Sequence, residues 1–343
     1  MQYNHIESKK KTYKIKQPLR EFLKSYSRLA TLPLTYTDLL AFEQSIPVLD
    51  SEDNDTLWRS VLYNQHEMAR LYEGLINVYE LLTFDGAKIP YLKVSCIDFC
   101  TFGNSQPFRV KIVNELNDNH DYFYVKRADA SRVYGLELED IFSPDKLNYL
   151  VHKETLIEDH VVGIPVDEFI AKYKFHKVDN RMRLAKEFIK FNERCFSRLL
   201  GDMRAYNFVI EIIQDFDNVQ YRLRPMDFDQ QSFEGRKNIY LPQFYSDNVE
   251  LVNLASELMN KDSVEQYQRQ ERVAMKKRFL STKQRTKSLL RKLKTDRIST
   301  SEHVTQLKND LYKHHKDDRF LACKSMGEIL IVQLENQLQI KIF

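Results

Sequence analysis

The hydrophobic pattern of this chain changes twice along its length, and these changes constrain the fold more than any other feature. Apolar residues recur at helical spacing from about Pro18 to Phe84, whereas short β-rich runs alternate with turns from Lys88 to Asp129. Helical spacing returns at Val166 and, apart from one predicted hairpin, continues to the end of the chain. Helices before and after a group of antiparallel strands predict an α+β fold.

The length and composition allow a large core. A chain of 343 residues with 43% hydrophobic content is expected to divide that core between two lobes or domains. We expect a helical region over 1–86, a sheet with one helix and a hinge over 87–164, and a helical catalytic region over 165–262. A helical extension over 263–343, with a basic segment at 272–297, completes the predicted organisation.

Each predicted element follows from one of these patterns. Helices are predicted over 20–30, 37–46 and 57–82, and the polar run 51–56 is interpreted as the loop and N-cap of the third helix. The strands of the predicted antiparallel meander cover 91–100, 108–116 and 122–127. Further predicted elements are a helix over 131–142, strands over 147–151 and 155–164, a helix over 180–200 that ends at Gly201, and a hairpin of 208–213 and 221–226.

Composition excludes several classes of protein. The 52 lysines and arginines nearly balance the 49 aspartates and glutamates, so the net charge of +3 does not indicate a nucleic-acid or membrane protein. None of the 8 glycines forms a G-x-G pair, which excludes the dinucleotide fingerprint and the Gly-rich P-loop. The motifs H-E-x-x-H, C-x-x-C and G-x-S-x-G do not occur either.

The cysteines and the apolar runs indicate the cellular compartment in which the chain is expected. Four scattered cysteines do not suit a disulfide scaffold, and no stretch approaches the ~20 apolar residues of a membrane span. The N-terminal residues contain lysines without a following apolar region. We therefore expect a cytoplasmic chain that is neither exported nor embedded in a membrane.

Two motifs flank the predicted hairpin. Residues 201–208 (GDMRAYNF) precede it and resemble the G-D-x-x-x-x-N loop of aminoglycoside phosphotransferases and other atypical kinases, which is also the D-x-x-x-x-N core of protein-kinase catalytic loops. Residues 226–229 (MDFD) follow the hairpin and resemble the hydrophobic-D-F element of the same superfamily. The resemblance implies that Asp202 is the catalytic base and that Asn207 and Asp227 hold Mg²⁺.

The resemblance extends upstream of these motifs. Residues 123–126 (FYVK) resemble the strand that bears the phosphate-contacting Lys126, although Lys111 in the preceding strand is a rival for that role. The helix that follows offers Glu137 or Glu139 as the carboxylate partner of the lysine, and the sequence leaves both open.

Residues 156–165 (LIEDHVVGIP) resemble the strand and hinge at which adenine docks in small-molecule and ubiquinone-type atypical kinases. This implies that the backbone of Glu158, Asp159 and His160 makes the adenine hydrogen bonds. The resemblance covers about 88–245, less than half of the chain, and implies a bilobal kinase-like core with an antiparallel N-lobe sheet and a helical C-lobe.

Phosphoryl transfer explains these residue types. It needs metal-binding groups near the triphosphate, a cation on its oxygens and a carboxylate that orients the attacking hydroxyl. The resemblance therefore implies an ATP- and Mg²⁺-dependent phosphotransferase acting on a hydroxyl, with a small molecule preferred over a protein as acceptor. Nucleotidyl transfer on the same scaffold is a further alternative.

Three departures from the family pattern support another alternative, a catalytically inactive kinase-like scaffold. The turn at 102–105 contains one glycine in place of a Gly-rich loop, Leu200 stands where the phosphotransferases often have histidine, and Asp229 replaces the glycine of D-F-G. Such a scaffold would bind a partner through its basic C-terminal helix.

The basic segment has two interpretations. Residues 272–297 contain eleven lysines and arginines against one acidic residue, Asp296. The segment is either a solvated helix whose apolar residues pack on the domain or a binding site for a polyanion or an acidic partner.

Overall fold

The computed structural model describes residues 10–173, 178–215 and 218–343. The chain forms two compact units. Unit 1 comprises Met1–Ala130 and Leu147–His160, and unit 2 comprises Ser131–Lys146 and Val161–Phe343. The predicted α+β class, with an antiparallel sheet and a helical C-terminal part, is confirmed.

Unit 1 is built on a seven-stranded sheet in which every neighbouring pair is antiparallel. The strand order is β1-β2-β3-β4-β5-β7-β6. The strands are β1 (Gln44–Leu49), β2 (Asp55–Leu62), β3 (Leu92–Cys100), β4 (Phe108–Asn114), β5 (His120–Arg127), β6 (Tyr149–His152) and β7 (Thr155–Asp159). The meander predicted after Lys88 corresponds to β3, β4 and β5.

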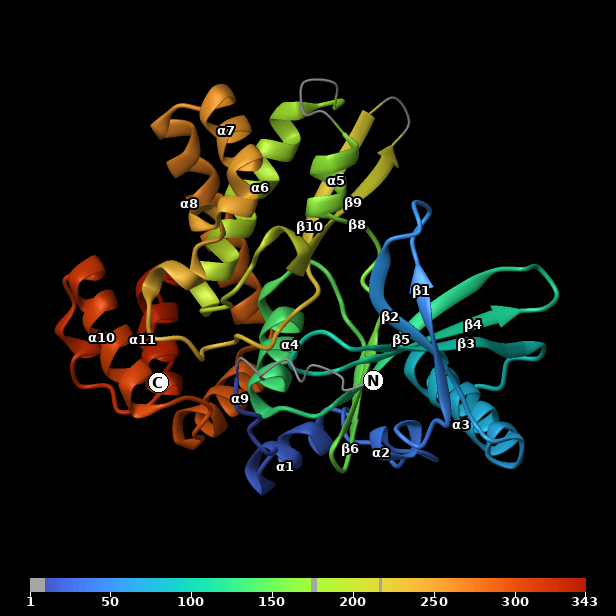
Figure 1. Ribbon diagram of the computed structural model, residues 1–343. Helices are drawn as coiled ribbons and strands as arrows, with labels where there is room; N and C mark the ends of the chain where they lie inside the picture. The colour runs from blue at the N-terminus through green and yellow to red at the C-terminus, as the bar shows by residue number, and fades with distance from the viewer. Residues whose placement is uncertain (1–9, 174–177, 216–217) are drawn as a thin grey trace. The chain divides into compact units, whose positions relative to one another are not determined.

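One helix covers the apolar face of this sheet. The helix α3 (Gln65–Phe84) contributes Leu75 and Val78 to a core shared with Val110 and Ile157, all four fully or almost fully buried, and Figure 1 shows it beside β3 and β4. Burial of each such side chain contributes roughly 1.5–3 kcal/mol. Because side chains alternate along a strand, the opposite face carries the polar residues of β5 and β7. Two shorter helices, α1 (Gln17–Ser25) and α2 (Tyr36–Leu39), complete unit 1.

The prediction that the chain is helical from about Pro18 to Phe84 is wrong for 44–62. This segment forms the β1–β2 hairpin, and Trp58 pairs with Cys100 of β3. The apolar spacing in such runs fits a helix or a strand, and here the two runs pair with each other while the second also pairs with β3. The polar run 51–56 lies in the hairpin turn and the first residues of β2, and the N-cap of α3 is Asn64, whose side chain accepts a hydrogen bond from the His66 amide.

Unit 2 contains most of the helices and a small sheet of order β10-β9-β8. Its strands are β8 (Ile164–Pro165), β9 (Phe208–Asp215) and β10 (Asn218–Pro225). Its α-helices are α4 (Ala130–Phe142, whose first residue belongs to unit 1), α5 (Val166–Lys172), α6 (Arg181–Arg198), α7 (Val249–Leu258), α8 (Lys261–Ser281), α9 (Lys283–Thr295), α10 (Ser301–His315) and α11 (Met326–Leu338). None of the helices in the described ranges has the length and apolar character needed to cross a membrane.

The end of α6 differs in detail from the prediction. Leu199 adopts the left-handed conformation that was expected of a terminating glycine, with a φ of 54°. Gly201 lies where space is limited, because a Cβ there would lie 3.0 Å from Ile239 Cγ2 and 3.2 Å from the Gln230 carbonyl oxygen. The close approach of these segments sets the path of the loop that begins at Gly201.

Candidate functional site

The loop after α6 holds Asp202 in a fixed conformation. Its φ of 57° lies in the left-handed region, which aspartate tolerates better than most residues but which still carries strain. The Asp202 amide donates to the Ile239 carbonyl at 3.2 Å and to the Tyr245 hydroxyl at 3.1 Å. Hydrogen bonds therefore hold a strained residue in place, which is common at functional sites.

Asn207 links this loop to the segment after the β9–β10 hairpin. Its side-chain Nδ2 donates to the Asp202 carbonyl at 2.7 Å, and its own carbonyl accepts from the Met226 amide at 3.0 Å. Burial raises the pKa of Tyr206, and the negative charge of Asp202 raises it further, whereas Arg204 lowers it. The structure thus brings Asp202, Asn207 and Asp227 together in unit 2.

Arg204 belongs to the same loop and is a functional residue that the sequence motifs did not predict. Its Nε donates to Asp202 Oδ1 at 3.3 Å, and its Nη1 donates to Asp247 Oδ2 at 3.2 Å. Burial alone would lower the pKa of Arg204, but the hydrogen bond to Asp247 and the nearby negative charges raise it. The sequence signal that could have identified Arg204 is its position two residues after Asp202.

Arg132 of α4 contacts the other half of the site. Its Nη1 donates to Asp227 Oδ1 at 2.6 Å and to Asp229 Oδ1 at 2.9 Å, and its Nη2 donates to the Met226 carbonyl at 3.3 Å. Only 2% of the Arg132 side chain is exposed, compared with 34% for Asp227. The sequence offered no signal for this contact, because the residues are 95 positions apart.

The oxygen atoms of Asp227 and Asn207 are of the type that binds Mg²⁺, but the negative charge of Asp227 is already balanced by an arginine. Carboxylate and amide oxygens, as in Asp227 and Asn207, are ligands that Mg²⁺ takes. However, the Asp227 carboxylate already binds the Arg132 guanidinium. Within the part of the chain that the structure describes, no group of three or more His, Cys, Asp or Glu residues is arranged to hold a metal. The metal-binding roles of Asn207 and Asp227 therefore remain predictions.

Lys126 lies in unit 1 and contacts a carboxylate other than the two that were expected. Its Nζ lies 2.8 Å from Glu158 Oε2, and only 8% and 4% of the two side chains are exposed. The register of β5 and β7 explains this contact, because Tyr124 pairs with Glu158 and Lys126 with Leu156, so Lys126 and Glu158 are diagonal neighbours on one face. The role of Lys126 at a phosphate stays a prediction.

The two expected partners of Lys126 have arginine partners within unit 2. Glu137 accepts from Arg285 at 2.9 Å, and Glu139 forms an ion pair with Arg198. Arg285 also donates to Asp140 at 2.6 Å. Burial alone would lower the pKa of Arg285, but the two carboxylates raise it above its ordinary value.

The predicted adenine strand is β7, which lies between β5 and β6. The Asp159 amide therefore already donates within the sheet, to the Asn148 carbonyl at 2.9 Å. A hydrogen bond of 3.2 Å joins the Tyr124 hydroxyl and His160 Nδ1, and burial raises the pKa of Tyr124 to about 12. Ile157 is fully buried in the core on the α3 side of the sheet, so it faces away from the polar face. The adenine contacts of Glu158, Asp159 and His160 remain predictions.

The basic segment covers the second half of α8 and all of α9, and several of its cations bind within unit 2. Arg272 contacts Glu193 at 3.0 Å, and Arg278 donates to the Phe142 carbonyl at 2.9 Å. Leu289 and Leu293 are fully buried. These contacts support the interpretation of a helix packed on the domain, and a polyanion partner stays a prediction.

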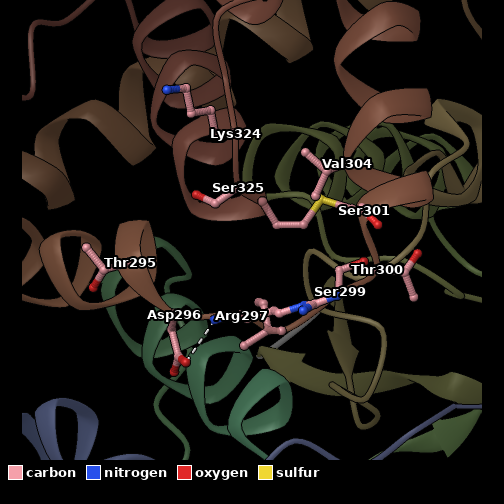
Figure 2. Close-up of a pocket in the computed structure, with 11 residues that line it drawn as sticks. Thr295, Asp296, Arg297, Ser299, Thr300, Ser301, Val304, Lys324 and Ser325 are labelled. Carbon is pink, nitrogen blue, oxygen red and sulfur yellow. Dashed lines mark hydrogen bonds between the residues drawn. The ribbon is translucent and has the colours of Figure 1, made fainter.

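A separate cavity of about 470 Å³ lies between the α9–α10 connection and the start of α11 (Figure 2). Its lining includes Asp296, which accepts from the Arg297 amide at 2.9 Å and from the Tyr134 hydroxyl of α4 at 3.2 Å. The side chains of Thr300 and Ser325 already cap α10 and α11. None of the predicted catalytic, cofactor-binding or metal-binding residues is among the described residues that line this cavity.

Comparisons with known proteins do not assign a function to this chain. No family model and no curated protein matches the sequence. A solved structure of the Rio2 kinase–ADP/Mg²⁺–phosphoaspartate complex from Chaetomium thermophilum is similar over 85% of this chain and 81% of that chain, with 9% identity and a TM-score of 0.29. A TM-score this low supports no assignment, so any function must be argued from the residues of this chain.

Proposed function

We propose that this chain is a phosphotransferase of the atypical kinase-like type, which transfers a phosphoryl group from ATP to a hydroxyl. The observation that carries the proposal is that hydrogen bonds of Asn207 join the loop of Asp202 to the segment that carries Asp227 in unit 2. These residues have the types, order and spacing of a phosphoryl-transfer loop followed by a D-F element. ATP is the phosphoryl donor in this proposal, and Mg²⁺ is the cofactor that the family resemblance implies.

The loop residues have distinct proposed roles. Asp202 orients the acceptor hydroxyl and takes its proton as the acceptor oxygen bonds to the γ-phosphorus and the bridging β–γ oxygen leaves. The side chain of Asp202 is 31% exposed, so an acceptor can reach it. The adjacent Arg204 guanidinium would stabilise negative charge on the transferred group. A small-molecule acceptor is preferred.

Unit 1, taken by itself, carries separate candidates for nucleotide contacts. The Lys126 ammonium would bind phosphate oxygens, and its 2.8 Å contact with Glu158 would fix its position. Adenine would dock at the end of β7, against the backbone of Glu158, Asp159 and His160.

The test is ADP formation from ATP in the presence of Mg²⁺ and a panel of small-molecule and protein hydroxyl acceptors. Asp202→Asn should lower kcat by about 100-fold or more, because it removes the base. The matched control is Glu257→Gln, which removes an exposed carboxylate of unit 2 that pairs with Arg181 and should leave kcat unchanged. A wild-type activity that Asp202→Asn preserves would contradict the proposal.

A second candidate function is nucleotide binding without transfer. The contact between Arg132 and Asp227 favours it, because that carboxylate already has a cation. In this case ATP would bind and no acceptor would be phosphorylated, and the basic segment 272–297 would be the partner-binding surface. The same assay, combined with ATP titration, distinguishes the two functions.

A further inference from the structure

The starting point is the charge around Asp227. Asp227 and Asp229 each direct one carboxylate oxygen at the same atom, Nη1 of Arg132, at 2.6 and 2.9 Å. The Asp229 amide also donates to Asp227 Oδ1 at 3.0 Å. Two carboxylates that share one cationic atom are close enough for a single cation to bind both.

The helix that carries Arg132 is fixed in unit 2. The hydroxyl of Ser131 donates to the carbonyls of Asp229 and Gln231, at 3.2 and 2.7 Å. A Cβ at Gly135 would lie 2.9 Å from Phe228 Cβ, so α4 packs directly on the D-F segment. The guanidinium is therefore held against the two carboxylates by backbone contacts as well as by its own hydrogen bonds.

We propose that Arg132 is a built-in cation that replaces a divalent metal ion at Asp227. A guanidinium offers one positive charge and fixed donors, and it neutralises one of the two carboxylates at this place. A divalent ion would have to displace this buried and hydrogen-bonded group before it could bind both carboxylates. The site therefore has low intrinsic affinity for Mg²⁺ or Mn²⁺.

This proposal also predicts how nucleotide affinity depends on divalent ions, and this second prediction rests on the proposed function. A bound triphosphate would meet a guanidinium at Asp227 in place of a tightly held metal ion. Nucleotide affinity should then depend little on divalent ions, whereas a metal-dependent kinase binds its nucleotide as the metal complex.

The first experiment measures Mn²⁺ binding to the full chain by titration calorimetry, without nucleotide. Arg132→Gln should bind Mn²⁺ about tenfold more tightly than wild type, or better, because the Arg132 charge no longer competes with the metal for the two carboxylates. Arg132→Lys keeps the charge but not the fixed donors, so its Mn²⁺ affinity should stay below that of Arg132→Gln. Adding Asp227→Asn to Arg132→Gln should abolish the gain. A matched control, Arg222→Gln, removes an arginine that pairs with the single carboxylate of Asp145 and should give no gain.

Thermal unfolding covers the case in which Arg132→Gln folds poorly. The variant should have a lower Tm than wild type, and Mn²⁺ should raise the Tm of the variant more than that of wild type. Wild-type protein that binds Mn²⁺ as tightly as Arg132→Gln overturns the proposal. So does a variant that gains neither Mn²⁺ affinity nor Mn²⁺-dependent stability.

The second experiment titrates ATP in EDTA and in Mg²⁺. Wild-type affinity should differ by less than about threefold between the two conditions, and Arg132→Gln should bind ATP about tenfold more tightly with Mg²⁺ than with EDTA. Wild-type binding that requires Mg²⁺ overturns the inference about Arg132. If no variant binds ATP, the proposed function fails, and the Mn²⁺ experiment alone decides the role of Arg132.

Discussion

The contact between Arg285 and α4 predicts a large loss of stability when the arginine is removed. Arg285 donates to Glu137 through Nε and Nη2 at 3.2 and 2.9 Å, and to Asp140 through Nη1 at 2.6 Å. The exposed fractions of the Glu137 and Asp140 side chains are 0% and 5%. Arg285→Met therefore removes a cation from two buried carboxylates, which are costly to desolvate without one.

The magnitude follows from this burial. Removing one partner of a buried ion pair costs about 3–5 kcal/mol, a large part of the ~5–15 kcal/mol that stabilises a folded protein. Lys146 Nζ lies 3.3 Å from Asp140 and compensates part of the charge, so we expect a loss of about 3 kcal/mol, at the lower end of this range. Unfolding in urea, followed by far-ultraviolet circular dichroism, measures it as a change in the free energy of unfolding.

Two further variants make this prediction specific. Arg285→Met combined with Glu137→Gln and Asp140→Asn should recover at least part of the loss, because the buried charges are then gone. Lys283→Gln removes an exposed cation from the same helix and should change the free energy of unfolding by less than about 0.5 kcal/mol. A loss below about 1 kcal/mol for Arg285→Met, or a triple variant less stable than the single one, would refute the reasoning.

Three other predictions concern the rest of the chain. Lys126→Met should lower the free energy of unfolding in urea by about 3–5 kcal/mol, because it removes the cation 2.8 Å from the buried Glu158 carboxylate. Adding Glu158→Leu should recover part of this loss. Equal stability of Lys126→Met and wild type would contradict the prediction. Burial lowers the pKa of His315, so the unfolded state binds more protons below about pH 6.5 and the free energy of unfolding should fall as the pH falls from there. His315→Asn should flatten that dependence in unfolding measured between pH 7 and 5, and an unchanged slope would exclude His315 as its source. Replacing Lys276 and Lys277 by glutamine should weaken heparin binding and reduce its salt dependence, and wild-type protein without salt-sensitive binding would favour the packed-helix interpretation.

The parts of the site that could be predicted are local in sequence. Asp202 and Asn207 lie in one loop between a helix and a hairpin, and the hairpin returns the chain to place Asp227 beside them. Periodicity was sufficient to find these elements because the helix and both hairpin strands carry clear patterns. It was not sufficient for 44–62, where the run forms two strands that pair with each other and, through β2, with β3.

The contacts of Arg132 and Arg285 could not be predicted, because each joins distant parts of the chain, whereas Arg204 lies only two residues from Asp202. Arg132 and Asp227 are separated by 95 positions, and Arg285 and Glu137 by 148. No local pattern encodes such a pair. The partner of Lys126 depended on the register between β5 and β7, which a strand prediction does not specify.

The most direct test of the proposed phosphoryl transfer is a single-turnover reaction with ATP labelled at the γ-phosphate and with protein in excess. We predict that wild-type protein transfers the label to a hydroxyl acceptor. Asp202→Asn should bind the same ATP but transfer the label at least about 100-fold more slowly. Equal transfer rates for the two proteins, or wild-type protein that does not bind ATP, would contradict the assignment of Asp202 and the function built on it.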